Sequence, residues 1–462
     1  MISHFYMPTR VVAGQGSLAT IGTLARDLAM SRVLVVSDPV ISQQPFHAEA
    51  LAALEAAEIA TARFDDCGID ARCSHIDTEG ARVRREGIDG VVCIGGGSVM
   101  CTGKGIAIVA TNRKPMAECT GVGRFDKRAL PMIMVPTTAG SGSEVSQWTI
   151  VKDEERHLKL LGGGPLSFPD AAILDPVTLR SLPMRVAALP AVDALTHAVE
   201  AYFSAIGSPI TDALAIAAVR LQYGSLRASI NSDDERARED NLVASCMANI
   251  ACGNARLGHG HALSLPLEGH LDLPHPYGVG VLLPHVTAFN LAVLPHKVKP
   301  LAEALEVETA GLSRPEMIEA CAEAIRSLYR DIGFPLGLHR RAAAGGARAR
   351  DGAARCAGPL RRHRRSRLRP GHRQRPHRDR LPFGPQDDGR AGRGHLPALP
   401  RLRPRRHLNA FSGGTTPWTS RSCITTTCPR SARRSVSPSG SRGWPGARWR
   451  RRSGRHDRTL CR

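Results

Sequence analysis

Residues 87–97 read GIDGVVCIGGG and residues 130–144 read LPMIMVPTTAGSGSE, and these two stretches decide the fold. Each is a continuous apolar run followed directly by glycines or small hydroxyl residues. A short apolar run bounded by glycines is typical of a strand buried on both faces of a parallel sheet. Residues 32–38, RVLVVSD, repeat the pattern and end in a carboxylate. We therefore predict three parallel strands whose C-terminal ends share one edge.

Helical stretches alternate with these strands. Residues 51–62 and 78–86 are predicted helices, and the alternation indicates an α/β domain with a parallel sheet over residues 1–180. Beyond residue 180, segments such as PAVDALTHAVEAYFSAIG and PITDALAIAAVRLQYGSL carry apolar residues at helical spacing. We expect an all-α C-terminal domain over residues 181–337.

The charge of the chain is divided unevenly. The net charge of +20 combines a segment from residue 339 onward, with 33 Arg, no Lys, five Asp and no Glu, and a mildly acidic segment of net −8 before it. Helical periodicity ends near residue 338, and the Arg-rich composition offers little to bury. We expect residues 338–462 to form a non-globular tail, since such a composition cannot supply a core.

We interpret this tail as the product of a shifted reading frame, because natural basic tails usually mix Lys with Arg. A coding sequence in which no one-base correction restores a helical continuation would contradict this hypothesis. The alternative is a genuine nucleic-acid-binding tail, which the scarcity of aromatic residues for base stacking disfavours.

Cysteine usage and hydropathy bear on the compartment. The twelve cysteines form no C-x-x-C pair, so a disulfide framework or a zinc ribbon has little support. No window approaches the roughly 18 apolar residues that a membrane span needs, and the N-terminus MISHFYMPTR has no long apolar run. We expect a cytoplasmic protein with reduced thiols and no membrane partner.

The two small-residue turns are candidate phosphate-binding loops. Glycines at residues 95–97 let a backbone approach a pyrophosphate, and free amides at a helix N-terminus supply donors. The second turn, residues 136–144, adds hydroxyl groups suited to phosphates and ribose. Asp38, at the end of the first strand, would accept hydrogen bonds from an adenosine ribose and repel a 2′-phosphate, which favours NAD over NADP. Either turn alone could be an ordinary solvated loop.

A second constellation carries metal-binding residue types. Asp193 and His197 are four apart, so on a helix they share one face. His261 and His275 follow across a proline-interrupted stretch. One carboxylate and three imidazoles could bind a divalent cation and leave a position for a substrate oxygen. For each histidine taken singly, a structural role is the more common one, so the prediction depends on the set of four.

These motifs, in this order, resemble the iron-type alcohol dehydrogenase family. The resemblance covers roughly residues 5 to 337 and rests on MPTRVVAGQGSL, GGGSVMCTGKG, PTTAGSGSE, ILDPVTLRSLP, DALTHAVEAY, HALSLPLEG and PHPYGVGVLLPHV. It implies a dinucleotide-binding α/β domain and a helical domain, the architecture shared with dehydroquinate synthase. It also implies hydride transfer between a small alcohol, or a hydroxy acid or aldehyde pair, and NAD.

The resemblance assigns roles residue by residue. It implies a homodimer and a divalent metal, Fe²⁺ or Zn²⁺, between which the ligands do not choose. The implied metal ligands and catalytic residues are Asp193, His197, His261 and His275. The implied cofactor-binding residues are Asp38 at the adenosine ribose, Gly96, Gly97 and Ser98 at the pyrophosphate, Thr137, Thr138 and Ser141 nearby, Lys159 near the nicotinamide-side ribose, and Leu179 at the adenine.

Several positions depart from the family pattern. Cys101 stands where the family usually has Asp, and Leu265 replaces a second histidine, so a proton-relay role for that position is absent. Pro276 and Tyr277 replace the glycine that usually follows His275. The Arg-rich tail has no counterpart of the family's last helices. The first three changes suggest a substrate pocket that differs from those of the simple-alcohol members.

A lyase of the dehydroquinate synthase type is the alternative enzyme, because it also uses NAD and a metal. The D-A-L-T-H spacing and the PTTAGSGSE turn resemble the dehydrogenases more closely. Net conversion of NAD to NADH would separate the two, since the lyase recycles its cofactor. Nucleic-acid binding through the basic tail is the non-enzymatic alternative, and its mark would be a steep salt dependence.

Overall fold

The computed structural model describes residues 3–271 and 273–337, and the account below is confined to them. A six-stranded, all-parallel sheet forms the N-terminal part, in the order β1-β9-β6-β4-β2-β3. The strands are β1 (Arg10–Ala13), β2 (Arg32–Val36), β3 (Ala60–Phe64), β4 (Gly90–Gly95), β6 (Met132–Pro136) and β9 (Ala171–Leu174). The predicted strands within 32–38, 87–97 and 130–136 are β2, β4 and β6, which are adjacent in the sheet.

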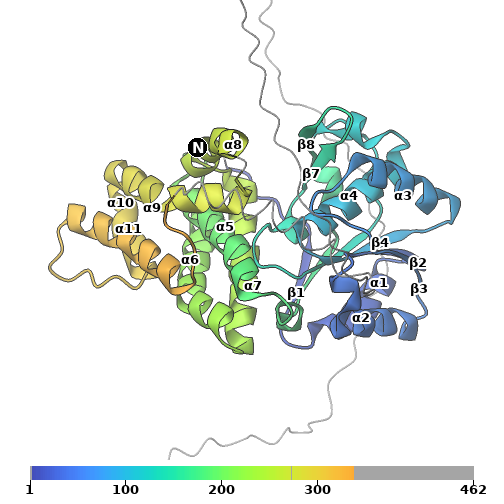
Figure 1. Ribbon diagram of the computed structural model, residues 1–462, viewed down its shortest axis with the longest axis horizontal. Coiled ribbons are helices and arrows are strands. Elements are labelled where there is room, and N and C mark those ends of the chain that lie inside the picture. Colours follow the sequence, from blue (N-terminus) through green and yellow to red (C-terminus); the bar gives the residue numbers. More distant parts are fainter. Residues whose placement is uncertain (1–2, 272, 338–462) are drawn as a thin grey trace, which may run out of the picture. The chain divides into compact units, whose positions relative to one another are not determined.

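Alternate residues of the central strands build two separate cores. In β4, Val91 and Cys93 belong to one apolar cluster and Val92 and Ile94 to the other, as expected when successive side chains point to opposite faces. One face is covered by α3 and α4 and the other by α1 and α2 (Figure 1). These helices are α1 (Ile21–Asp27), α2 (Pro45–Ala56), α3 (Cys73–Arg85) and α4 (Gly97–Asn112).

Two of the predicted helices need correction. The predicted helix 51–62 ends at Ala56, and residues 60–62 instead begin β3. β3 is an edge strand with a half-exposed side-chain pattern, so it lacks the continuous apolar run that identified the central strands. The predicted helix 78–86 is the C-terminal part of α3, which begins five residues earlier, at Cys73.

A small second sheet and several short helices complete the α/β part. The sheet contains β5 (Gly121–Val122), β8 (Leu158–Gly163) and β7 (Trp148–Asp153), with β7 and β8 antiparallel. The 3₁₀ helices are η1 (Ser17–Thr20), η2 (Ile41–Gln43), η3 (Met116–Cys119), η4 (Ser143–Val145), η5 (Pro165–Ser167) and η6 (Pro176–Leu179). β7 begins shortly after the second small-residue turn, so the hairpin extends directly from it.

From Met184 onward the described chain is helical. Side-chain caps set some of the helix starts: Ser208 caps one helix in a capping box, and Asp234 accepts a hydrogen bond from the Ala237 amide at the start of the next. The helices are α5 (Met184–Phe203), α6 (Pro209–Asn231), α7 (Glu235–Ala255), α8 (His259–Leu271), α9 (His275–Val293), α10 (Pro295–Ala304) and α11 (Arg314–Asp331). All of them except α8 contribute to one apolar core, and the arrangement confirms the predicted fold class of a parallel α/β part followed by an all-α part.

The predicted domain boundary at residue 180 falls between η6 and α5 and stays a prediction. The predicted tail, residues 338–462, lies outside the described residues.

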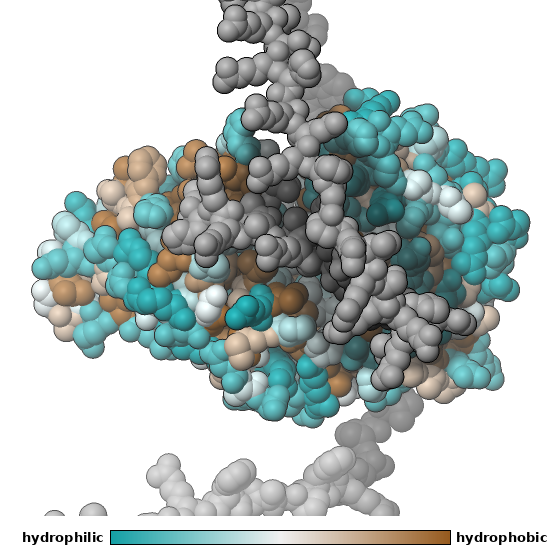
Figure 2. Space-filling view, in the orientation of Figure 1, coloured by the Kyte–Doolittle hydropathy of each residue, from teal (hydrophilic) through white to brown (hydrophobic). Residues whose placement is uncertain are grey.

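One helix in the described part, α9, is long and apolar enough to cross a membrane by length and composition. Most of its apolar window, 56%, is buried inside the protein, and Leu283 and Leu291 belong to the helical core. Packing in that core accounts for its apolar character. Over the face in Figure 2, the α/β part is mainly hydrophilic, whereas apolar residues recur on the helical part.

Candidate functional site

The two small-residue turns lie against each other at the C-terminal edge of the sheet. β4 ends at Gly95, Gly96 is the N-cap of α4 and Gly97 is its first residue. A Cβ placed on Gly96 would lie 3.6 Å from the side chain of Thr138, and one on Gly97 would lie 3.0 Å from the hydroxyl of Ser141. The sheet therefore brings the first turn to the second, with the free amides of the α4 N-terminus between them.

Several residues predicted to bind the cofactor already make hydrogen bonds within the protein, through a side chain or through the backbone. The Ser98 hydroxyl donates to the Ile69 carbonyl oxygen. Thr137 is buried, and its amide donates to the Gly95 carbonyl at 3.1 Å. Asp38 uses Oδ1 to accept from the amides of Val40 and Ile41, both at 2.9 Å. Both of these hydrogen bonds of Asp38 use Oδ1, and neither engages Oδ2.

Lys159 and Leu179 have contrasting surroundings. Lys159, on β8, is exposed and pairs with Asp70 at 2.9 Å. Its charge acts on His275, where it opposes protonation, so it lies within electrostatic range of the helical part. Leu179 is buried in an apolar cluster with Ala139 and Leu242. Its side chain contributes to the core beside the second turn.

A residue from the helical part enters the second turn. Gly142 has φ +59°, and a Cβ there would lie 1.9 Å from the side chain of Asn249 on α7. The Asn249 amide donates to the Gly140 carbonyl oxygen at 2.8 Å. Only glycine combines this left-handed backbone with such a close neighbour, so α7 and the turn are fitted to each other.

Below this turn, Lys104 and Glu144 are buried together. The Lys104 ammonium donates to the carbonyl oxygens of Ser146 and Trp148, at 2.7 and 2.8 Å. Burial lowers the pKa of Lys104 to about 8 and raises the pKa of Glu144 to about 7. The two hydrogen bonds of Lys104 fix the segment that joins the second turn to β7.

Asp193, His261 and His275 converge from three helices. Asp193 lies on α5, His261 on α8, and His275 is the first residue of α9. One ligand atom from each lies within 4.8 Å of the others. The Nε2 atoms of both histidines are 3.8 Å from Asp193 Oδ1. We refer to these three residues as the Asp–His cluster.

Two further carboxylates orient the histidines of the cluster. His261 Nδ1 is 2.6 Å from Glu200 Oε2, and His275 Nδ1 is 2.8 Å from Glu268 Oε1. An anionic carboxylate can only accept, so each Nδ1–H donates the hydrogen bond, and in the neutral form of either ring the lone pair is then on Nε2. Both Nε2 atoms thus present lone pairs toward Asp193.

This arrangement leaves electron-pair acceptors facing one another without a donor. Asp193 Oδ1 and His261 Nε2 are buried and have no hydrogen-bond partner in the described part of the protein. Buried polar atoms without partners cost free energy, and a cation would satisfy all of them at once. Two imidazoles and a carboxylate suit Fe²⁺ or Zn²⁺, so the residues present fit a divalent metal.

His197 lies beside the cluster and outside the set of mutually close ligand atoms. Its Nε2 is 3.6 Å from Asp193 Oδ1, and its ring stacks on that of His261 with centroids 4.9 Å apart. Its Nδ1 is buried and has no hydrogen-bond partner within residues 3–271 and 273–337. All four residues predicted as metal ligands are therefore neighbours, and three of them form the tight set.

Protonation of the histidines follows their surroundings. Burial lowers the pKa of His197 to about 4, which keeps this ring neutral. Burial also disfavours the charged form of His275, but the Glu268 hydrogen bond and Asp193 outweigh it and raise the pKa of His275. The pKa values of Glu200 and Glu268 are lowered despite burial, chiefly by their histidine partners. Both carboxylates thus remain anionic acceptors.

Glu200 and Glu268 were missed by the sequence analysis. Glu200 follows Asp193 by seven residues on α5, and with His197 it completes an i, i+4, i+7 face, a signal that was present in the sequence. Glu268 contacts His275 across the break between α8 and α9. No helical spacing predicts that contact.

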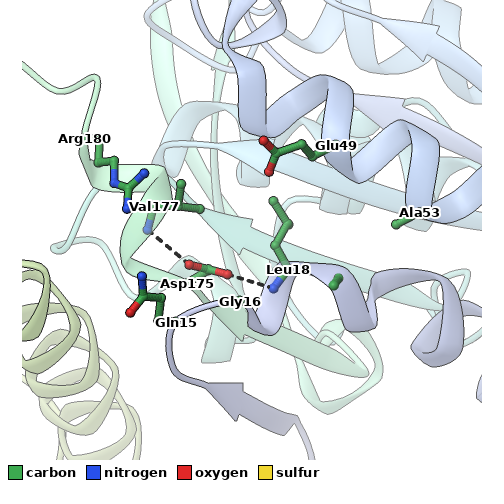
Figure 3. Close-up of a pocket in the computed structure, with 9 residues that line it drawn as sticks. Gln15, Gly16, Leu18, Glu49, Ala53, Asp175, Val177 and Arg180 are labelled. Atoms are coloured by element: carbon green, nitrogen blue, oxygen red, sulfur yellow. Dashed lines mark hydrogen bonds between the residues drawn. The ribbon is translucent and has the colours of Figure 1, made fainter.

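A cavity elsewhere in the α/β part contains none of the predicted site residues. It measures about 290 Å³ and lies beside Glu49 and Arg180. Asp175 within it accepts hydrogen bonds from the amides of Leu18 and Val177, at 2.9 and 3.1 Å (Figure 3). The role of Asp175 is to join η1 to η6, and we assign this cavity no ligand.

The fold and the cluster together define a class of protein: a dinucleotide-type parallel sheet followed by a helical part that can hold a divalent cation. Residues 8–176 match the iron-containing alcohol dehydrogenase family, and residues 187–345 match its C-terminal family.

Individual relatives agree with this class. A 1,3-propanediol dehydrogenase of Klebsiella pneumoniae is 34% identical over 334 residues, which are 72% of this chain and 86% of the relative. A crystal structure of 1,3-propanediol oxidoreductase superposes with a TM-score of 0.71 at 33% identity, covering 74% of this chain and 90% of that one. Sulfoacetaldehyde reductase from Bifidobacterium kashiwanohense, in complex with NAD⁺, gives 0.67 at 27% identity, covering 73% and 88%.

The chain belongs to the iron-containing alcohol dehydrogenase family. It is an NAD-dependent, metal-dependent alcohol oxidoreductase, which confirms the predicted function. The lyase alternative and the nucleic-acid alternative are not favoured by these relatives.

Proposed function

We propose that this enzyme transfers a hydride between a small alcohol and NAD in a site that joins the Asp–His cluster to the paired turns at the sheet edge. The metal ligands in this proposal are Asp193, His197, His261 and His275. The substrate class, a short alcohol or diol with its aldehyde, draws support from the similarity to 1,3-propanediol dehydrogenase.

The observation that carries the proposal is that hydrogen-bond acceptors converge on Asp193 and Asp193 Oδ1 has no donor among the described residues. The two histidines of the cluster, each held by its own carboxylate, direct Nε2 toward Asp193 Oδ1 at 3.8 Å, and Asp193 Oδ1 has no hydrogen-bond partner among the described residues. A metal bound there supplies Lewis acidity that stabilises negative charge developing on the substrate oxygen. Between Fe²⁺ and Zn²⁺, which both accept these ligands, the name of the family favours Fe²⁺.

The chain's own residues contribute position and charge. Asp193 supplies the negative charge of the cluster, and Glu200 and Glu268 hold the Nδ1 protons that keep both rings in the ligating tautomer. Burial of Asp193 and His261 excludes water from the inner side of the site. These groups are arranged before substrate arrives, so little reorganisation accompanies the reaction.

The cofactor end of the proposed site is the paired turns. The α4 N-terminus offers amides to the pyrophosphate, and nicotinamide is the carrier of the hydride when NAD is bound. Asp38 would meet the adenosine ribose through Oδ2 and exclude a 2′-phosphate, which favours NAD. The proposed cofactor-binding residues are Asp38, Gly96, Gly97, Ser98, Thr137, Thr138, Ser141, Lys159 and Leu179.

The proposal extends to assembly and compartment. β1 is the last strand of the sheet and pairs on one side with β9, so its other edge is open to a second copy. This supports a homodimer. The eight cysteines in the described part of the chain are all free, which supports a reducing, cytoplasmic location.

Metal analysis combined with an NADH absorbance screen over short alcohols, diols and hydroxy acids tests the proposal. We expect a divalent metal near one per chain, turnover with at least one short alcohol, loss of turnover on exhaustive chelation, and recovery on adding Fe²⁺. Full turnover after chelation would contradict the metal's role. Turnover without net NADH formation would instead point to the lyase chemistry.

A further inference from the structure

The two carboxylates that hold the cluster histidines differ in how firmly they are fixed. The Glu200 side chain is 1% exposed and accepts from His261 Nδ1 and from the amides of Gly258 and Gly260. It therefore joins α5 to the start of α8 whether or not a ligand is present. Glu268 is 17% exposed and accepts a hydrogen bond from His275 Nδ1 at 2.8 Å. The Ser264 side chain, on the same helix α8, also lowers the pKa of Glu268 by hydrogen bonding, so within the described residues His275 is the hydrogen-bond partner of Glu268 outside α8.

His275 itself has little else to hold it. Its side chain is 41% exposed, against 10% for His261. An imidazole with this much free surface can rotate about its side-chain bonds, and without an acceptor at Nδ1 either nitrogen can carry the proton. The contact with Glu268 selects the ring orientation that points Nε2 toward Asp193.

The packing around Glu268 makes room for this contact. A Cβ placed on Gly278 of α9 would lie 3.0 Å from Glu268 Oε1. Because residue 278 has no side chain, the Glu268 carboxylate can approach the backbone of the first turn of α9, the helix that begins at His275. Both α8 and α9 thus contribute to one hydrogen bond.

We propose that Glu268 is a positioning residue whose hydrogen bond to His275 Nδ1 sets the affinity of the site for its cation. The inference rests on the proposed metal site and goes further, because it makes Glu268 the adjustable support and Glu200 the fixed one. Loss of Glu268 should leave the fold intact and loosen one ligand, whereas loss of Glu200 should also destabilise the protein.

Co²⁺ titration of the metal-depleted full-length protein tests this, with the visible d–d absorption of Co²⁺ as a readout that does not depend on turnover. Replacing Glu268 with Ala should raise the Co²⁺ dissociation constant by about 10–100-fold, the usual cost of losing such a support. Glu268→Gln, which keeps an acceptor oxygen, should recover most of the affinity. Glu323→Gln, at a side chain 51% exposed that pairs with Arg326 and Arg330 on α11, is the matched control and should match wild type.

Thermal unfolding of the metal-depleted variants separates positioning from a structural role. Glu268→Ala should keep the Tm of wild type, and Glu200→Ala should lower it. Unchanged Co²⁺ affinity in Glu268→Ala overturns the inference. So does complete loss of Co²⁺ binding, equal to that of Asp193→Ala, because Glu268 would then be a ligand. Failure of the wild-type protein to bind Co²⁺ at all would instead count against the proposed metal site.

Discussion

The α/β part and the helical part of this protein prepare for their ligands in opposite ways. At the sheet edge two of the polar side chains are hydrogen-bonded within the protein: Ser98 donates to Ile69, and Asp38 Oδ1 accepts from the amides of its own turn. In the helical part, Asp193 Oδ1 and His261 Nε2 are buried with no partner among the described residues. The proposed dinucleotide site, built largely from backbone amides, can therefore persist without its ligand, while the proposed cation site retains an energetic cost until it is filled. This difference predicts that the two ligands can be removed independently.

The largest effect should follow from Asp193→Ala. This change removes the carboxylate on which both Nε2 atoms converge, so we expect loss of bound metal and a fall in kcat/KM of roughly 10³-fold or more, as several kcal/mol of charge stabilisation disappear. NADH affinity, measured by fluorescence titration, should stay within about threefold of wild type, well under one kcal/mol.

One result for Asp193→Ala would contradict the independence of the α/β part and the helical part. If NADH affinity fell together with metal content, the two ligands would be coupled. Glu323→Gln, a charge removal at a half-exposed side chain of α11, serves as the control for both measurements.

An effect of intermediate size is expected from Gly96→Val, and it should weaken NADH binding and leave metal binding unchanged, the reverse of Asp193→Ala. The backbone at Gly96 has φ −81°, and the nearest side-chain atoms to a new Cβ are 3.6 Å away on Thr138. Valine thus fits the fold but occupies space beside the α4 N-terminus. A steric cost of about 1–3 kcal/mol would raise the NADH dissociation constant by roughly 10–100-fold. Metal content should be unchanged, and unaltered NADH affinity would remove this turn from the site.

The smallest effect concerns stability near the second turn. Burial raises the pKa of Glu144 from 4.5 to about 7, so between these values the folded state holds a proton that the unfolded chain releases. Stability should therefore fall as pH rises through this window. Glu144→Gln imitates the protonated form, so it should match wild type near pH 4.5 and exceed it by about 1–3 kcal/mol near pH 8.

Urea unfolding at the two pH values measures this difference. Glu303→Gln, at a side chain 49% exposed, is the control and should show no such pH dependence. A Glu144→Gln effect of equal size at both pH values would contradict the assigned titration.

The sequence predicted the central strands well and the edges poorly, for a physical reason. Every residue of β4 is buried, so its apolar run is continuous and unmistakable. β3 has one fully buried residue, Ala62, among exposed neighbours, and its sequence ATARF merged with the preceding helix. Edge strands carry less hydrophobic signal because only part of their surface meets the core.

In the candidate site, too, some contacts could be predicted from the sequence and others could not. Asp193 and His197 could be paired from their spacing alone, because one helix carries both. The convergence of His261 and His275 required the family resemblance, and the contact between Glu268 and His275 had no signal at all. Contacts across the break between α8 and α9 depend on tertiary packing, which local periodicity does not encode.

The contact of the Asn249 side chain with the second turn has a consequence for expressing the α/β part of this enzyme as a separate fragment. The Asn249 amide completes a turn that belongs, by sequence, to the other half of the chain, and Gly142 has no side chain so that this residue can enter. An excised sheet-bearing fragment would lack that support. The second turn therefore does not keep its shape independently of the helical part, because it depends on a helix that begins more than ninety residues later.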